Sequence, residues 1–225
     1  MTMLRAARLI AAKDLRLELR TRDVLGAIAL FALLVVVVAS FAFPTSGEGR
    51  EGVAAGMLWM AILFASLLGM GRTFAIEKDE ACIDALMVAP VPRESIFVGK
   101  LASNLMFTGA AEVGILPVFL VLLGLAPGGG VVLLALATIL GTLALVTVGT
   151  LFSAMAVNLR TREAVLPLLV LPVSLPAMIA AVKATEASLQ GSAPGAALQW
   201  LLLLAAYAAL FLLVAFVTFP YLLEE

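Results

Sequence analysis

Four polar residues recur at every fourth position in the third long apolar stretch of this sequence, and they are its best candidates for chemistry. Lys100, Asn104, Thr108 and Glu112 would form one stripe along a helix, because residues four apart lie on the same helical face. A carboxylate inside an apolar stretch is costly to bury, so it normally faces a bundle interior, a cavity or a polar partner. We therefore expect Glu112, with Asn104 and Thr108, to serve transport or a polar contact between subunits.

The sequence also allows a second interpretation of Glu112. Gly109, Gly114 and Pro117 surround this residue, and they could break or shorten the helix that carries it. Glu112 would then lie closer to the external water than its position in the apolar stretch suggests.

No set of residues in the sequence suits catalysis, haem ligation or nucleotide binding. The chain has no histidine and one cysteine, Cys82, so the usual ligation of haem by His or by paired Cys is excluded. The nine methionines are more typical of packing, and Tyr207 and Tyr221 are more typical of aromatic belts at the membrane interfaces. Gly128-Gly129-Gly130 is followed by Val131, so it lacks the lysine and hydroxyl of a P-loop. We expect a non-enzymatic chain with no cofactor or metal of its own.

The longest charged segment lies between two apolar stretches, from Glu77 to Pro92. Its apolar residues share one helical face, and its acids lie near the start of the expected helix, where the macrodipole favours them. The apolar residues are Ile83, Leu86 and Met87, and the acids are Glu77, Asp79, Glu80 and Asp84. Pro90 and Pro92 would end the helix. This pattern predicts an amphipathic helix, parallel to the membrane, that docks in a groove on a soluble partner; a solvated linker is the alternative.

The composition is that of a polytopic membrane protein. Of the 225 residues, 64% are hydrophobic and 13% are charged, whereas a soluble protein is about half apolar and a quarter charged. One membrane span needs about 20 apolar residues. We predict a single all-α membrane domain over residues 1–225 with six transmembrane helices. The expected spans are Val24–Phe43, Val53–Gly71, Leu101–Leu125, Val131–Val157, Ala164–Val182 and Leu198–Phe219.

The basic residues predict how the chain is oriented. Twelve of the 14 Lys and Arg residues lie before Asp23, between Arg72 and Lys100, or at Arg160 and Arg162. Because cytoplasmic connections carry the excess of basic residues, these segments and both termini are predicted to be cytoplasmic. The apolar stretch after Asp23 has spanning length and no small-residue cleavage site, so we expect the first span to be retained. The net charge of −1 argues against a nucleic-acid partner.

Residues 1–22 predict an amphipathic helix instead of a span. One side would carry Leu4, Ala7, Ala11 and Leu15, and another would carry Arg5, Arg8, Lys13, Arg16 and Arg20. Such a helix can lie along the inner leaflet, with its arginines at anionic lipid headgroups. The alternative is a basic lead-in that only fixes the orientation.

The fourth and fifth predicted spans carry packing and bending signals. Small residues in the fourth span are typical of close helix packing; they are Thr138, Gly141, Thr142, Gly149 and Ser153. Pro167, Pro172 and Pro176 should bend the fifth span, and the sequence leaves open whether the bend serves gating or irregular packing. We expect the polar segment from Lys183 to Gly195 to be an external loop or a short interfacial helix.

Two parts of the chain resemble a known family of membrane proteins. The order Arg72-Thr73-Phe74-Ala75-Ile76-Glu77, Ile83-Asp84-Ala85-Leu86-Met87, Pro90-Val91-Pro92 and Gly99-Lys100 looks like the segment between the second and third spans of ABC exporter permeases. The proline-bearing stretch from Leu166 to Pro176 is similar to the fifth span of a narrower family, the CcmB haem exporter permeases of bacterial cytochrome c maturation. The resemblance implies that residues 72–100 form a cytoplasmic coupling segment. It places Glu77, Asp84, Leu86 and Pro90 at the contact with an ATPase subunit.

The same resemblance implies a set of partners and a function. It implies a permease subunit of an ATP-driven complex that acts in haem export or haem-chaperone release for cytochrome c biogenesis. ATP would be bound by a soluble ATPase subunit, and a second copy of the chain would complete the membrane part. Haem would be handled by another membrane subunit and a periplasmic haem chaperone. The alternatives are a permease of the same superfamily that exports a lipid, drug or polysaccharide, and a purely structural anchor subunit.

Overall fold

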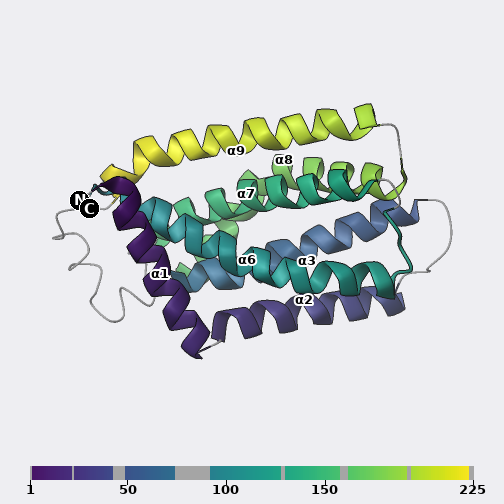
Figure 1. The fold of residues 1–225 in the computed structure, drawn as a ribbon, viewed down its shortest axis with the longest axis horizontal. Coiled ribbons are helices and arrows are strands. Elements are labelled where there is room, and N and C mark those ends of the chain that lie inside the picture. The colour runs from purple at the N-terminus through teal and green to yellow at the C-terminus, as the bar shows by residue number, and fades with distance from the viewer. Residues whose placement is uncertain are drawn as a thin grey trace.

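The computed structural model describes residues 2–21, 23–42, 49–73, 92–127, 130–157, 162–191 and 194–222. All regular structure in these ranges is helical. The helices are α1 (Met3–Thr21), α2 (Asp23–Ala42), α3 (Arg50–Thr73), α6 (Glu94–Leu122), α7 (Val131–Ala156), α8 (Arg162–Leu189) and α9 (Pro194–Leu222). Figure 1 shows α2 to α9 running side by side along the long axis of the molecule, with α1 crossing one end of the bundle.

Six of these helices, α2, α3, α6, α7, α8 and α9, are long and apolar enough to cross a membrane. The predicted all-α fold with six transmembrane helices is therefore confirmed for the part of the chain that the structure describes. The helix predicted within residues 1–22 is present as α1, and its place at the membrane surface stays a prediction. The coupling helix predicted within residues 72–100 falls largely at 74–91, outside the described residues.

Two helices extend furthest beyond one of their predicted bounds. α6 begins at Glu94, seven residues before the expected start at Leu101, and α8 continues to Leu189 instead of ending at Val182. The expectation of an external loop or short separate helix from Lys183 onward was thus wrong as far as Leu189. The reason is packing: Ala184, Thr185 and Ser188 are buried, and the hydroxyl of Thr185 accepts a hydrogen bond from the indole N–H of Trp59 on α3 at 2.9 Å.

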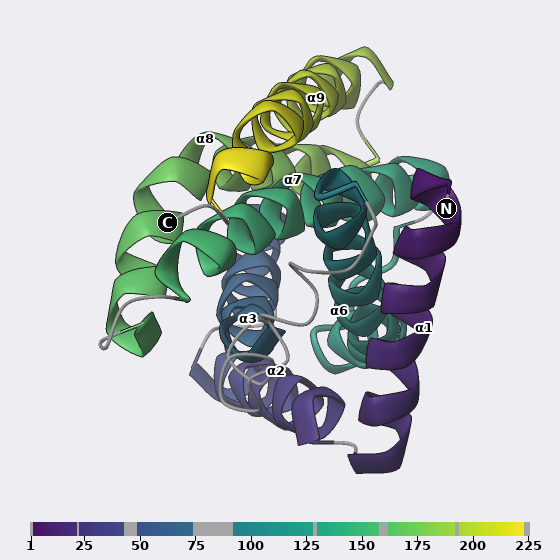
Figure 2. The same cartoon turned by 90° about the vertical axis from the view of Figure 1, so that its left-hand side faces the viewer.

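α7 is the central helix of the bundle. It packs against α8, α9, α6 and α3, and in the end-on view of Figure 2 it lies between α9 on one side and α3 and α6 on the other. α3 is the most buried of the six spans, whereas α2 and α9 are the least buried and lie on opposite outer sides. An inner pair formed by α3 and α7 is therefore covered by the remaining helices.

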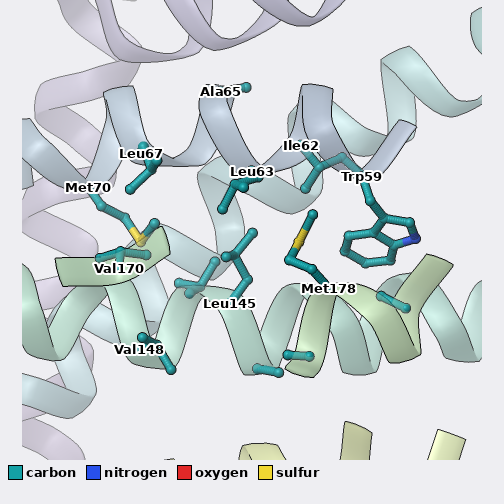
Figure 3. Close-up of a cluster of buried hydrophobic side chains, with 14 of the residues drawn as sticks. Trp59, Ile62, Leu63, Ala65, Leu67, Met70, Leu145, Val148, Val170 and Met178 are labelled. Carbon is teal, nitrogen blue, oxygen red and sulfur yellow. The ribbon is translucent and has the colours of Figure 1, made fainter. Parts of the chain in front are cut away.

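Glycines on α7 make room for the largest side chains of α3. A Cβ atom at Gly141 would overlap with Cη2 of Trp59, and one at Gly149 would overlap with the sulfur of Met70. Figure 3 shows both side chains in the cluster where α3 meets α7 and α8, together with Leu145, Val148, Val170 and Met178. The packing role predicted for Gly141 and Gly149 is confirmed.

The prolines of α8 do not interrupt it, because the helix runs unbroken past Pro167, Pro172 and Pro176. Each proline lacks the N–H that would bond the carbonyl four residues earlier, at Glu163, Leu168 and Pro172. The hydroxyl of Tyr207 on α9 donates to a neighbouring carbonyl of α8, that of Val173, at 2.5 Å and so joins the two helices close to the prolines. Tyr207 lies midway along α9 and not near either end, so the prediction that it belongs to an interfacial aromatic belt was wrong. Tyr221, in the last turn of α9, is exposed.

The buried face of α1 differs in part from the predicted one. Ala6, Ala7 and Ile10 are buried against the rest of the protein, whereas Leu4 is 70% exposed. The helix packs mainly on α6, so its buried face is set by that contact and not by its most hydrophobic side. At its end, the carboxylate of Glu18 accepts a hydrogen bond from the backbone N–H of Leu25 at 2.7 Å, which joins the end of α1 to the start of α2.

Candidate functional site

The four predicted docking residues, Glu77, Asp84, Leu86 and Pro90, lie outside the described residues. Their role stays a prediction. The structure does place the two helices that lead into and out of this segment, because α3 ends at Thr73 and α6 begins at Glu94.

The start of α6 is held firmly by the end of α9. The guanidinium of Arg93 donates to the backbone carbonyl of Pro220 at 3.0 Å. One turn further, the ring of Phe97 is fully buried and packs against Phe219, with ring centroids 5.4 Å apart, and against Phe216. A displacement of the segment before α6 would therefore be transmitted to both α6 and α9.

The intramembrane polar residues meet a matching set of hydroxyls on α7. Asn104 donates from its side-chain amide to the hydroxyl of Thr150 at 3.0 Å, and the hydroxyl of Thr142 donates to a carboxylate oxygen of Glu112. Both pairs are buried, and Glu112 is only 7% exposed. The two pairs are two turns apart on each helix, with opposite chain directions. We call this set, Asn104, Thr108, Glu112, Thr142 and Thr150, the polar seam.

Thr108 lies one turn from both Asn104 and Glu112 and is equally buried on the same face of α6. The predicted stripe is thus confirmed as a buried face. The alternative interpretation of Glu112 was wrong, because α6 is unbroken from Glu94 to Leu122, past Gly109, Gly114 and Pro117. Glu112 is therefore covered by protein within the bundle.

Lys100 extends the line of the polar seam toward α1. Its ammonium lies 3.0 Å from a carboxylate oxygen of Asp14, and Lys100 is 2% exposed. The hydroxyl of Ser103 donates to the same carboxylate oxygen at 3.2 Å. A charged pair this well covered needs its partners in place, because an ammonium or a carboxylate away from water is costly to bury without them. We call Asp14, Lys100 and Ser103 the α1 clamp.

The polar seam is suited to fixing α6 and α7 relative to one another. Within the described ranges no three acids, cysteines or histidines come together as metal ligands. A carboxylate that receives a hydroxyl hydrogen bond from the next helix resists separation and rotation of the two helices, since their separation would leave it unpaired in an apolar interior. The seam is therefore a polar contact that holds α6 against α7.

Three elements of this arrangement were missed from the sequence. Thr142 was interpreted as a packing residue, Thr150 was not singled out, and Asp14 was not recognised as a partner of Lys100. One signal was present: Thr142 and Thr150 are eight residues apart, the same spacing as Asn104 and Glu112. That match becomes informative only when the helices are known to be neighbours in antiparallel register.

The opposite end of the bundle is closed by contacts between turns and helix ends. The guanidinium of Arg50 donates to the backbone carbonyl of Gly124 at 2.6 Å, which joins the start of α3 to the turn after α6. Lys183 and Glu186 form an ion pair at 2.8 Å on α8, close to Gly52 of α3. These contacts are exposed or near the surface, and they provide matched control positions for the buried residues above.

Comparison with known proteins gives a consistent result over nearly the whole chain. The model of one protein family, described as CcmB protein, matches residues 5–223. Heme exporter protein B of Rhodobacter capsulatus is 34% identical over 186 residues, which cover 83% of this chain and 85% of that protein. Heme exporter protein B of Paracoccus denitrificans is 33% identical over 189 residues, 84% and 86% of the two chains. Heme exporter protein B of Pseudomonas aeruginosa is 30% identical over 200 residues, 89% of each chain.

Proposed function

The chain belongs to the CcmB protein family, and from this we propose that it is the membrane-spanning permease subunit of an ATP-driven complex for haem export. The observation that carries the proposal is the match over residues 5–223, together with relatives that are named heme exporter protein B and align along most of their own length. The six helices long enough to span a membrane support the permease role. Within that role, the finer proposal is that the complex exports haem or releases haem from a chaperone for cytochrome c biogenesis.

The proposed energy source is a separate chain. The sequence has no P-loop, so we assign ATP binding and hydrolysis to a soluble ABC ATPase subunit. That subunit would dock on the segment that contains Glu77, Asp84, Leu86 and Pro90. Its closure on ATP would push on the end of α3 and the start of α6, which flank the segment.

Because α3 and α6 both pack on α7, a displacement of their ends would be transmitted into the bundle. α3 reaches α7 through Trp59 and Met70, which fit against Gly141 and Gly149. α6 reaches α7 through the polar seam, at Asn104–Thr150 and Glu112–Thr142. A displacement of α3 and a displacement of α6 would therefore both reach α7, the central helix.

Haem is assigned to companion proteins because this chain has few groups that could ligate it. The sequence has no histidine, and the hydroxyl of Tyr207 is engaged with the carbonyl of Val173. We propose a second copy of this chain, another haem-handling membrane subunit and a periplasmic haem chaperone as partners. The proposed location is the bacterial inner membrane, in contact with its lipids and with both termini in the cytoplasm.

The test is a deletion of the gene, complemented with the wild-type chain or with the double variant Asp84→Ala/Leu86→Arg. Haem staining of c-type cytochromes and the haem content of the periplasmic chaperone are measured. We expect deletion to abolish c-type cytochromes with haem retained on the chaperone, and the double variant to show the same defect while still inserting in the membrane. The control Glu51→Ala/Ala126→Arg, at the other end of the bundle, should complement.

Two outcomes would contradict the proposal at different levels. Normal c-type cytochromes in the deletion strain would discard the haem function and leave the exporter of a lipid, drug or polysaccharide. Full complementation by a stably inserted Asp84→Ala/Leu86→Arg variant would discard the docking segment as the ATPase contact while leaving the haem function intact.

A further inference from the structure

The acidic and the basic residues of α1 lie on different sides of the helix. Its two acids, Asp14 and Glu18, face the protein, where Asp14 joins the α1 clamp and Glu18 accepts the N–H of Leu25. Its five basic residues all reach the surface: Arg5, Arg8, Lys13, Arg16 and Arg20. No ion pair joins the four arginines to an acid in the described part of the chain. One face of α1 is therefore positively charged and available to an anionic partner.

Exposed apolar side chains lie among these basic residues. Leu4, Leu9, Leu17 and Leu19 are exposed on the same helix, outside its contact with α6. A surface that mixes arginines with leucines matches a lipid interface, where headgroups pair with the cations and the acyl boundary takes up the apolar side chains. An acidic protein surface would pair with the arginines but would offer less to the leucines.

α1 crosses α6 close to the N-terminal end of α6. A Cβ atom at Gly99 would lie 2.8 Å from Cβ of Ile10 and 3.0 Å from the carbonyl oxygen of Ala7, so the two helices touch closely there. α6 has 29 residues, which is about 43 Å of helix, whereas the hydrocarbon core is about 30 Å thick. Lys100 lies in the second turn of α6. The crossing point is thus near the boundary between the lipid headgroups and the hydrocarbon core.

We propose that the basic face of α1 binds anionic phospholipid headgroups, and that the α1 clamp makes this lipid contact hold α6 in place. The lipid surface would then act on the same helix that the docking segment enters at Glu94. α1, held at the lipid surface, would then resist displacement of α6. This role is independent of the species that is transported.

The first experiment uses the full chain in nanodiscs of phosphatidylcholine, with and without phosphatidylglycerol, and measures the midpoint of thermal unfolding. Because a ligand that binds the folded state stabilises it, phosphatidylglycerol should raise the midpoint at low salt, and high salt should cancel the rise. Arg5→Gln/Arg8→Gln/Arg16→Gln should abolish the rise, since each basic residue near an anionic surface contributes about fivefold to binding. Lys183→Gln, an exposed basic position at the other end, should retain it.

A rise that persists in the triple arginine variant would overturn the proposal. Binding of a purified ATPase subunit is measured on the same variants. If the triple variant loses the ATPase subunit while its response to phosphatidylglycerol stays that of the wild type, the basic face contacts an acidic protein surface and the lipid assignment is wrong.

The second experiment tests the clamp. Asp14→Asn/Lys100→Met removes both charges together, so neither is left buried alone. A polarity-sensitive dye on Leu9→Cys, in a Cys82→Ser background, reports lipid contact of α1. We expect the dye to respond to phosphatidylglycerol as in the wild type while the rise in unfolding midpoint is lost. A rise equal to that of the wild type would show that the clamp does not transmit the lipid contact.

Gly99→Ala provides an independent second variant that leaves every charge unchanged. Its added methyl group would press on Ile10 and the Ala7 carbonyl and separate α1 from α6. In this variant too, the dye should still respond to phosphatidylglycerol, whereas the rise in unfolding midpoint should be lost. Gly114→Ala on the same helix, where nothing lies within 4 Å of the added methyl, should keep both responses.

Discussion

At the scale of single residues, the hydrogen bond from Thr142 to Glu112 matters most for the packing of α6 on α7. A buried carboxylate in an apolar bundle is tolerated only where a donor reaches it, and the structure supplies one from α7. The partner pair Asn104 and Thr150 repeats the contact two turns away. Two such pairs define the register of α6 against α7, because a shift of one residue would separate both.

Thr142→Val tests this contact, because it removes the hydroxyl and keeps the shape of the side chain. Glu112 would then lose its donor on α7, and unfolding in detergent should become easier by about 1–3 kcal/mol. Thr138→Val is the control, since the hydroxyl of Thr138 only donates to the carbonyl of Leu134 on its own helix. Equal unfolding midpoints for the two variants would show that the seam contact contributes no stability.

The sequence was sufficient to predict the seam residues on α6 but not those on α7. Glu112 and Asn104 stand out because carboxylates and amides are rare in apolar helices. Threonine is common in such helices as a packing residue, so Thr142 and Thr150 carried no distinct signal. Their role depends on the antiparallel register of two helices, which is fixed by tertiary packing. The docking residues at 77–90 remain a prediction in both position and role.

At the scale of helices, packing of large side chains against glycine joins α3 to α7. Trp59 lies over Gly141 and also donates its indole N–H to Thr185 on α8, so it joins three helices. Met70 lies over Gly149, and the carbonyl of Met70 accepts a hydrogen bond from Ser153 at 2.7 Å. The rigid indole and the flexible thioether should respond differently to a lost glycine.

Gly141→Ala should destabilise the protein more than Gly149→Ala. The indole of Trp59 has no room to move away from an added methyl group, and overpacking of this kind costs about 1–3 kcal/mol. Met70 can change its rotamer, so Gly149→Ala should cost less. Gly109→Ala meets nothing within 4 Å and should be neutral or slightly stabilising. The midpoints of thermal unfolding of the three variants check the order, and a reversed order of the first two would contradict it.

Tyr207→Phe tests the contact between α8 and α9. The variant loses the hydroxyl that donates to the Val173 carbonyl, next to the prolines of α8, and should be less stable by about 1 kcal/mol. Tyr221→Phe, at the exposed end of α9, should show no change in unfolding midpoint. Equal effects of the two variants would indicate that the Tyr207 hydroxyl is dispensable for the packing of α8 on α9.

Helix bounds were predictable where hydropathy sets them and not where packing does. The expected span Val131–Val157 matches α7, Val131–Ala156, because this helix is apolar throughout. α6 begins earlier than expected because its polar first turns are covered by α1 and α9, as the burial of Ser95 and Lys100 shows. α8 ends later than expected because its last turns pack on α3. Hydropathy treats such polar but covered residues as loop.

At the scale of the whole molecule, the two ends of the bundle are built differently. One end carries α1, the start of α6 and the end of α9, tied together by the α1 clamp and by Arg93 and Pro220 (Figure 1). The other end is closed by short contacts such as Arg50 to Gly124. The docking segment connects α3 and α6 at the first end, so force from a partner would enter where the basic residues of α1 also lie. The distribution of basic residues predicts that this end is cytoplasmic.

Labelling of single cysteines in intact cells checks this orientation. Cys82 is the chain's own cysteine and lies in the docking segment, so a membrane-impermeant maleimide should label it only after the cells are permeabilised. Thr2→Cys, just before α1, should behave likewise in a Cys82→Ser background. Ala126→Cys, in the exposed turn after α6, should be labelled in intact cells once the outer membrane is opened. Because the spans α2, α3 and α6 separate α1 from that turn, the two lie on opposite sides. The reverse labelling pattern would show an inverted protein, and the basic face of α1 would then meet the outer leaflet.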